Sequence, residues 1–312
     1  MENIYRLLRP EVNKNRRLVS AEIERLALSE DRVARYEPDL RKVIETLVDC
    51  EGWTSVSKVG DNLLGARKFG CTMSFEPGGQ WEVSAPPTST VSQWRKGQEK
   101  LDTELMALDA VKDLHTMHIG LNPWEAVDDI PLLPSPRYDL MDAHFKKVGG
   151  RGREMMRLTV GLQVNLDYNT EKHAMQLLRA GFFLAPPLSA LFSNSPFARG
   201  KSTGNLSERH FIWTKTDPDR SGFIEEALRE NFTLREYAAH IASVPLMYAF
   251  DEAGDVYGPQ GHPWKNLDSS DQERNALGPS SRCSLRPGSN RVPWRSAFLI
   301  RFRRRCLAAQ QP

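Results

Sequence analysis

Strict alternation of apolar and polar residues predicts three half-buried strands. Residues 74–87, taken in steps of two, place large apolar side chains on one face and polar side chains on the other. A period of two is typical of a strand with one buried face. The Pro-Gly-Gly segment at residues 77–79 is predicted to bend this strand and to let a ligand approach its backbone, although a simple turn fits equally well. Its polar face carries three candidate site residues: Glu76, Gln80 and Glu82.

The other two predicted strands repeat this design. Residues 16–28 carry an apolar face and a polar face, and residues 157–168 show the most regular alternation in the chain. Each polar face contributes two further candidates. These are Glu22 and Glu24 in the first strand, and Gln163 and Asn165 in the second.

Apolar residues spaced three and four apart predict helices that cover the apolar faces. The last helix begins with a capping box of Thr233 and Glu236, whereas residues 122–138 are predicted to form a proline-rich loop ending in Arg137 and Tyr138. Helices combined with alternating strands favour an α+β fold built on an antiparallel sheet. The predicted helices are residues 38–52, 95–115, 139–149, a segment starting near Thr170, and 232–245.

Charge is spread unevenly along the 312 residues. The formal net charge is +2, which argues against a dominant polyanionic partner. From residue 258 onward, however, ten basic residues accompany three acidic ones, which leaves 32 basic and 37 acidic residues in the rest. A basic terminal segment can bind nucleic acid or a membrane surface, but this one carries no nucleic-acid-binding motif, which makes that alternative the weaker one. Residues 298–306 are predicted either as a strand or as the product of a shifted reading frame.

The four cysteines and the N-terminus suggest a cytoplasmic protein. Cys50, Cys71, Cys283 and Cys306 match no zinc-binding spacing, which favours a reducing compartment. The N-terminus has no apolar leader, and no apolar run approaches the roughly 20 residues of a membrane helix.

Acidic side chains on neighbouring strands predict a metal site. If the polar faces join, four carboxylates lie close together, and their mutual repulsion is relieved by a hard cation such as Mg²⁺. Such a group of carboxylates could hold the metal-bound phosphates of ATP. The chain has no P-loop motif, so any ATP is not held by a P-loop. The alternative is an ordinary solvated sheet face, with Arg137 and Arg209 as surface residues. Four histidines are interpreted as structural: His115, His118, His210 and His262.

Five segments in order resemble the plant and proteobacterial type of glutamate–cysteine ligase. The resemblance runs from about Val19 to about Phe250. It implies a curved antiparallel sheet that forms a funnel like that of glutamine synthetase, with helices on its outer face. It also implies ATP-dependent joining of the L-glutamate γ-carboxylate to L-cysteine, through a γ-glutamyl phosphate, as the first step of glutathione synthesis. The segments are FEPGGQWEVSAPP, IPLLPSPRYDLM, EMMRLTVGLQVNLDY, RAGFFLAPPLSALFSNSPF and HFIWTKTDPDRSGF.

The resemblance also implies roles for individual residues. Arg209 would act in catalysis beside the phosphates and substrate carboxylates, and Arg137 would bind the glutamate α-carboxylate. Gln80, Gln163 and Asn165 would contact the nucleotide. The Mg²⁺ ligands would be Glu22, Glu24, Glu76 and Glu82.

Two departures from the family pattern open an alternative. The later strand motif of family members is absent, and Arg95 occupies the position of a regulatory cysteine in plant members. The sequence therefore predicts an incomplete catalytic core at residues 15–257 and an irregular basic tail at residues 258–312. The chain is either an active ligase or a truncated, inactive member that binds ligand or serves as a partner subunit. The amine acceptor follows from the resemblance alone, and the oligomeric state stays open.

Overall fold

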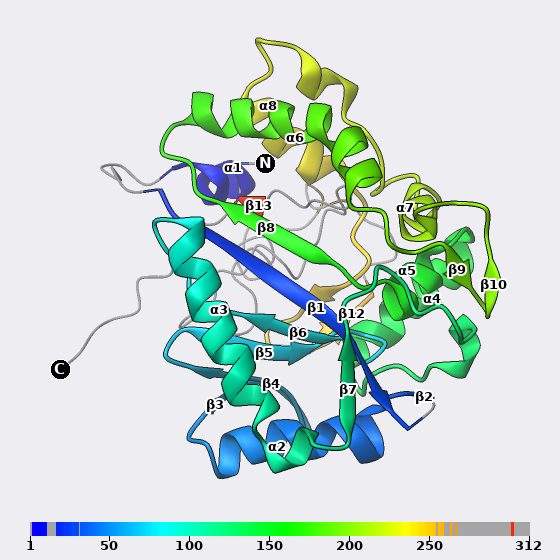
Figure 1. Cartoon of the computed structure of the whole chain (residues 1–312). Helices are drawn as coiled ribbons and strands as arrows, with labels where there is room; N and C mark the ends of the chain where they lie inside the picture. Colours follow the sequence, from blue (N-terminus) through cyan, green and yellow to red (C-terminus); the bar gives the residue numbers. More distant parts are fainter. Residues whose placement is uncertain are drawn as a thin grey trace.

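One long strand, β1 (Val19–Ser29), organises the protein in the computed structural model (Figure 1). The structure describes residues 2–10, 17–30, 32–253, 255–258, 263 and 266, and the backbone of residues 301–302. Within them, nine strands form one sheet, whose main path runs in the order β13–β8–β1–β6–β5–β4–β3, while β2 and β7 pair with β1. Neighbouring strands are antiparallel, except that β13 runs parallel to β8.

The strands of this sheet are short apart from β1. They are β2 (Arg32–Val33), β3 (Thr54–Val59), β4 (Asn62–Lys68), β5 (Cys71–Phe75), β6 (Trp81–Ser84), β7 (Leu114–Met117), β8 (Leu162–Leu166) and β13 (Arg301–Phe302). Two small hairpins lie outside it. They are formed by β9 (Phe197–Ala198) with β10 (Lys201–Ser202), and by β11 (Ala249–Phe250) with β12 (Val256–Tyr257).

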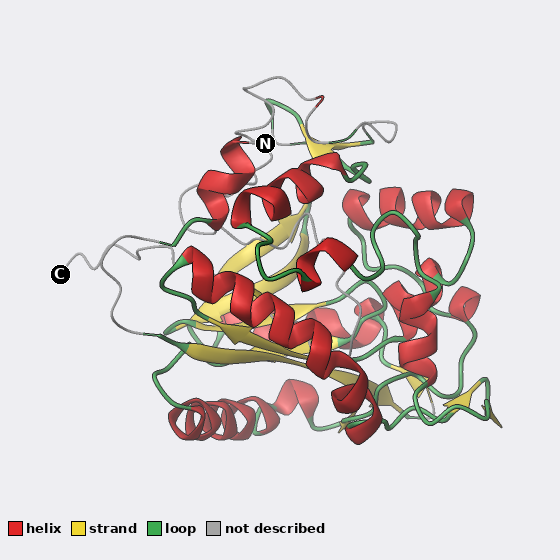
Figure 2. Ribbon diagram, turned by 90° about the horizontal axis from the view of Figure 1, so that it is seen from above, coloured by secondary structure: helices red, strands yellow, loops and turns green. Residues whose placement is uncertain are grey.

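Helices lie around the sheet (Figure 2). The α-helices are α1 (Glu2–Leu8), α2 (Arg41–Asp49), α3 (Val91–Met106), α4 (Pro136–Val148), α5 (Gly152–Leu158), α6 (Glu171–Leu191), α7 (Glu208–Thr214) and α8 (Leu234–Ser243). Four short helical turns complete the list: η1 (Tyr36–Leu40), η2 (Asp109–Val111), η3 (Val127–Asp129) and η4 (Glu225–Leu228). None of the helices in these described segments is both long enough and apolar enough to cross a membrane.

The main core lies between one face of the sheet and helices α2 and α3. Trp81 and Val83 of β6 are fully buried there against Ile44 of α2 and Leu105 of α3, together with other apolar residues. A second core joins α1, α6, α8 and η4. The predicted α+β fold with a large antiparallel sheet is confirmed, whereas the funnel shape stays a prediction.

Two predicted strands differ from the structure. Residues 74–87 form two strands joined by a turn at residues 76–80, instead of one bent strand. Of residues 157–168, only Leu162–Leu166 form a strand, because α5 extends through Leu158. The alternation was misleading there because helix α5 buries Arg157 and Leu158 against the segment that contains η3.

The predicted helices need smaller corrections. The helix expected through residue 115 ends at Met106, and the chain then forms η2 and β7. Arg137 and Tyr138 do not belong to a loop, since α4 begins at Pro136, a residue that suits the first helical position. The capping box of Thr233 and Glu236 is confirmed, and the Thr170 side chain caps α6. The predicted tail, residues 258–312, and His262 lie almost entirely outside the described residues.

A buried charge network ties α4 to the segment after α7. Asp217 accepts hydrogen bonds from His144 at 2.8 Å and from Arg220 at 2.7 Å, and Arg220 also donates to the carbonyl of Pro245. Burial alone would raise the pKa of Asp217, but the bond with His144 and the charge of Arg220 outweigh it, so the pKa is lowered. Asp217 therefore stabilises the fold only while it is ionised.

We expect this contribution to disappear in acid. Because the pKa of Asp217 is lower in the folded state, the stabilisation is complete above the ordinary aspartate pKa of about 4 and is lost as the pH falls below it. Asp217→Asn should lower the unfolding temperature at pH 7 and flatten its dependence on pH in this range. Asp61→Asn, at an exposed turn, is the matched control. Equal acid sensitivity of the two variants would contradict this account.

Candidate metal centre

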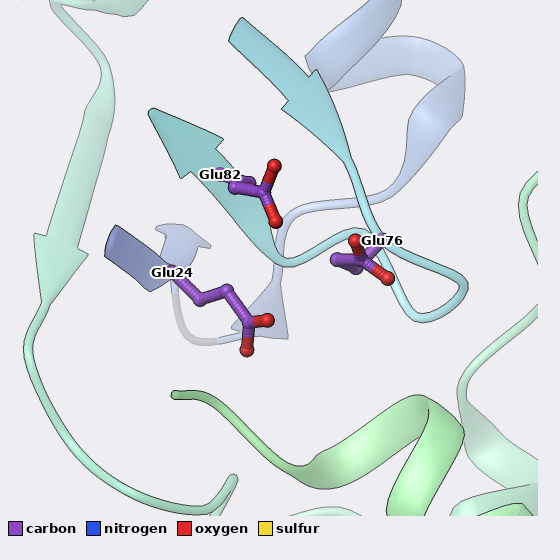
Figure 3. Close-up of side chains that lie close together, drawn as sticks. All are labelled: Glu24, Glu76 and Glu82. Atoms are coloured by element: carbon purple, nitrogen blue, oxygen red, sulfur yellow. The ribbon is translucent and has the colours of Figure 1, made fainter. Parts of the chain in front are cut away.

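Three carboxylates from different parts of the sheet converge on one point (Figure 3). Glu24 on β1 lies directly opposite Glu82 on β6, because these two residues are partners in the strand register. Glu76 follows β5 at the start of the turn into β6. One ligand oxygen from each of the three lies within 4.8 Å of the others. Strand pairing thus brings together residues that lie 58 positions apart in the sequence.

The turn that positions Glu76 is held by Gln80. The Gln80 side chain is 1% exposed and accepts a hydrogen bond from the Gly78 N–H at 2.9 Å. Its amide nitrogen donates to the carbonyls of Met156 at 3.1 Å and Thr159 at 2.9 Å. Gln80 was predicted to contact the nucleotide, but both the oxygen and the nitrogen of its side-chain amide form hydrogen bonds with the backbone. Gln80 fastens the turn to the end of α5.

The glycines of this turn meet the protein's own backbone. A Cβ atom on Gly78 would lie 2.3 Å from the carbonyl oxygen of Arg157. Gly79 has a φ angle of +85°, which favours glycine. A ligand was predicted to approach the backbone of this turn, but at Gly78 the approaching group is the last turn of α5.

Glu24 is oriented by the strand on its other side. The Gly161 N–H donates to Glu24 Oε2 at 2.6 Å, and Gln163 Nε2 donates to Glu24 Oε1 at 3.3 Å. Across the sheet, Ser74 Oγ donates to Glu82 at 3.4 Å, and the Glu82 residue is only 7% exposed. These contacts fix the acids at the floor of the site, where burial strengthens their electrostatic interactions.

Glu22 lies on the same face of β1 but outside the group of three. It pairs with Gln163 in the strand register, and its Oε1 accepts a hydrogen bond from Asn165 Nδ2 at 3.4 Å. Four converging acids were predicted. Within the part of the chain that the structure describes, three of them converge, and Glu22 lies two residues before Glu24 on the same strand. Gln163 touches Glu24, whereas Asn165 touches Glu22.

Arg209 approaches the acids from helix α7. Ser207 caps this helix, and Ser195 Oγ accepts a hydrogen bond from the Arg209 N–H at 3.2 Å. The guanidinium lies 5.7 Å from the centre of the Trp213 ring, one helical turn away. Burial lowers the pKa of Arg209, and the negative charge of Glu24 acts in the opposite direction. A desolvated positive charge therefore faces the carboxylates.

Arg137 is connected to the same turn through its neighbour. Its guanidinium donates to the Tyr138 hydroxyl at 2.8 Å, and that hydroxyl donates to the Phe75 carbonyl at 3.5 Å. Phe75 immediately precedes Glu76. The first turn of α4 thus connects Arg137, through the Tyr138 hydroxyl, to the strand that leads into Glu76.

The donor set fits a hard divalent cation. Three carboxylates at this spacing repel one another unless a positive charge neutralises them. Carboxylate oxygens are the ligands that Mg²⁺ prefers, and Mg²⁺ retains open positions for water or phosphate. Glu24, Glu76 and Glu82 could therefore hold such an ion, with Arg209 facing any anion bound to it.

Two residues around Arg209, Gly161 and Trp213, were not among the predicted site residues. Gly161 lies inside the alternating segment of residues 157–168, and a glycine inside a predicted strand often marks a close approach of another group. Trp213 lies four residues after Arg209, a spacing that places both on one side of a helix. These two signals were present in the sequence. The hydrogen bonds that hold Gln80 had no comparable signal.

Comparison with known proteins assigns the family. Residues 39–284 match the model of glutamate-cysteine ligase family 2. The chain is 34% identical over 222 residues to a chloroplastic glutamate–cysteine ligase of Arabidopsis thaliana, which covers 70% of this chain and 42% of that protein. Identity to glutamate–cysteine ligase B of Oryza sativa is 31% over 233 residues, which covers 74% and 47%. The chain thus spans less than half the length of these relatives. The chain belongs to glutamate-cysteine ligase family 2.

Proposed function

We propose that the protein catalyses ATP-dependent ligation of the L-glutamate γ-carboxylate to the amine of L-cysteine. The convergence of Glu24, Glu76 and Glu82 carries this proposal, because such a cluster suits a cation that binds phosphates. Family membership and the names of the relatives support the substrates. Those names place the relatives in chloroplasts; a cytoplasmic location of this chain stays a prediction.

The proposed reaction has two steps. A γ-carboxylate oxygen of glutamate attacks the terminal phosphorus of ATP, and ADP leaves. The cysteine amine then attacks the acyl carbon of γ-glutamyl phosphate, phosphate leaves, and the nitrogen loses a proton. Phosphoryl transfer depends mainly on alignment and charge neutralisation, which bound Mg²⁺ supplies.

The residues divide this work by position. Glu24, Glu76 and Glu82 hold the cation, and Glu22 supports them from the next position on the strand face. Arg209 stabilises negative charge on the transferring group. Arg137 binds the glutamate α-carboxylate through its planar guanidinium, and Gln163 and Asn165 line the approach of the nucleotide. We assign Gln80 to the support of the turn instead of to ligand binding, because its amide is occupied.

The decisive experiment is ADP release by the purified chain with Mg²⁺, ATP and L-glutamate, with and without L-cysteine. We expect cysteine-dependent ADP release, matched by formation of γ-glutamylcysteine. Omission of glutamate is the control for simple ATP hydrolysis. A folded chain that binds Mg²⁺ and ATP without turnover would overturn the proposal. It would favour the alternative of an inactive ligand-binding or partner subunit.

A further inference from the structure

We infer that Gly161 is a positioning residue, whose lack of a side chain lets the Arg209 guanidinium lie beside Glu24. A Cβ atom at position 161 would lie 2.7 Å from a terminal nitrogen of Arg209 and 3.3 Å from Glu24 Oε2. The same glycine donates its N–H to that Glu24 oxygen at 2.6 Å. Gly161 thus fixes the Glu24 carboxylate and leaves room for the Arg209 guanidinium beside it. The binding effects derived below rest on the proposed function.

Alanine at position 161 would disturb Arg209 selectively. The backbone of Gly161 does not adopt a positive φ angle, so alanine fits the local conformation. Two atoms would lie closer to the added Cβ than ordinary van der Waals contact. They are the terminal nitrogen of Arg209 and Oε2 of Glu24, and both lie at the ends of flexible side chains. The guanidinium can move away without displacement of the backbone. Gly161→Ala should therefore resemble the loss of Arg209 while the sheet is retained.

The charge of Arg209 gives this change a characteristic signature. A guanidinium beside Glu24 weakens cation binding by repulsion and strengthens binding of an anion. Its displacement should therefore tighten the binding of a bare divalent cation and weaken the binding of a nucleotide. General damage to the site would weaken both. The opposite signs separate the two explanations.

The experiment measures Mn²⁺ binding without nucleotide and ATP binding without metal, by calorimetry. Mn²⁺ is a suitable probe because it shares the preference of Mg²⁺ for carboxylate oxygens. In both Gly161→Ala and Arg209→Ala, the Mn²⁺ dissociation constant should fall and the ATP dissociation constant should rise, each on the order of tenfold. In the double variant, Gly161→Ala should add almost nothing to Arg209→Ala. Gly97→Ala, at an exposed position of α3 with only ordinary contact around its Cβ, should leave both constants unchanged.

Several results would overturn the inference. One is a double variant whose changes in the dissociation constants equal the product of the changes in the two single variants. Another is weaker binding of both Mn²⁺ and ATP by Gly161→Ala. If the unsubstituted chain binds neither Mn²⁺ nor ATP, the proposed function fails on its own. A crystal structure of Gly161→Ala then decides the inference: a guanidinium displaced from Glu24 supports it, and an unmoved guanidinium contradicts it.

Discussion

Glu82→Gln should reduce cysteine-dependent ADP release at least about 100-fold, a loss comparable to removal of one preorganised charge-stabilising group. Glutamine keeps the shape of the side chain but removes the negative charge that holds the cation. Glu82 is the most deeply buried of the three acids, so solvent compensates poorly for this loss. The measurement is steady-state ADP release at saturating Mg²⁺, together with the Mg²⁺ concentration that gives half-maximal rate.

The matched control for this prediction is Glu104→Gln. Glu104 is an exposed glutamate on α3 whose ion pair with Lys100 spans 3.8 Å at the surface, and surface pairs contribute little. Its substitution should change neither rate nor stability. Normal turnover by a folded Glu82→Gln protein would remove Glu82 from the proposed metal site.

Gly78→Ala should produce the largest loss of stability among the substitutions considered. The added Cβ would lie 2.3 Å from the Arg157 carbonyl oxygen and 2.7 Å from its Cα. Both atoms belong to the backbone of α5, so relief requires a shift of the helix or the turn. Overpacking typically costs about 1–3 kcal/mol, and we expect the upper end here because backbone atoms must move. A loss of about 3 kcal/mol should lower the unfolding temperature by roughly 10 °C.

Thermal unfolding followed by circular dichroism tests this expectation. Gly97→Ala again provides the control, since alanine is the better helix former and its Cβ would make ordinary contact with Ala85. We expect the control to unfold at the same temperature as the unsubstituted protein or slightly higher. Equal unfolding temperatures for the two variants would mean that α5 does not pack closely enough against Gly78 to exclude a methyl group.

Alternation along the chain predicted the polar face of the sheet correctly even where it misjudged the strands. The hairpin register pairs Phe75 with Trp81 and Ser74 with Glu82. Odd-numbered residues therefore pair with odd-numbered ones and even-numbered residues with even-numbered ones. The apolar and the polar face thus continue from β5 to β6, although the chain forms a turn between them instead of the predicted bend. The pairing of Glu24 with Glu82 likewise follows from faces that alternate on both strands.

Tertiary contacts decided what the sequence could not. The alternating pattern of residues 157–161 belongs to the end of a helix and a connection, because Arg157 donates to the carbonyls of Val127 and Ile130 and to Asp142. Glu22 and Glu24 looked equivalent in the sequence. Only Glu24 faces β6, and this difference depends on where β8 ends and β6 begins along β1.

The end of α5 is a shared anchor for both halves of the acid cluster. The carbonyls of Met156 and Thr159 hold the turn of Glu76 through Gln80, and the next residues lead to the Gly161 N–H that holds Glu24. These contacts join segments 76, 79 and 137 residues apart in sequence. Contacts between such distant segments carry a loop-closure cost that the rest of the folded structure must offset. A cation that binds only the assembled cluster therefore shifts the folding equilibrium toward the complete structure, so occupancy of the site and integrity of the fold are thermodynamically linked.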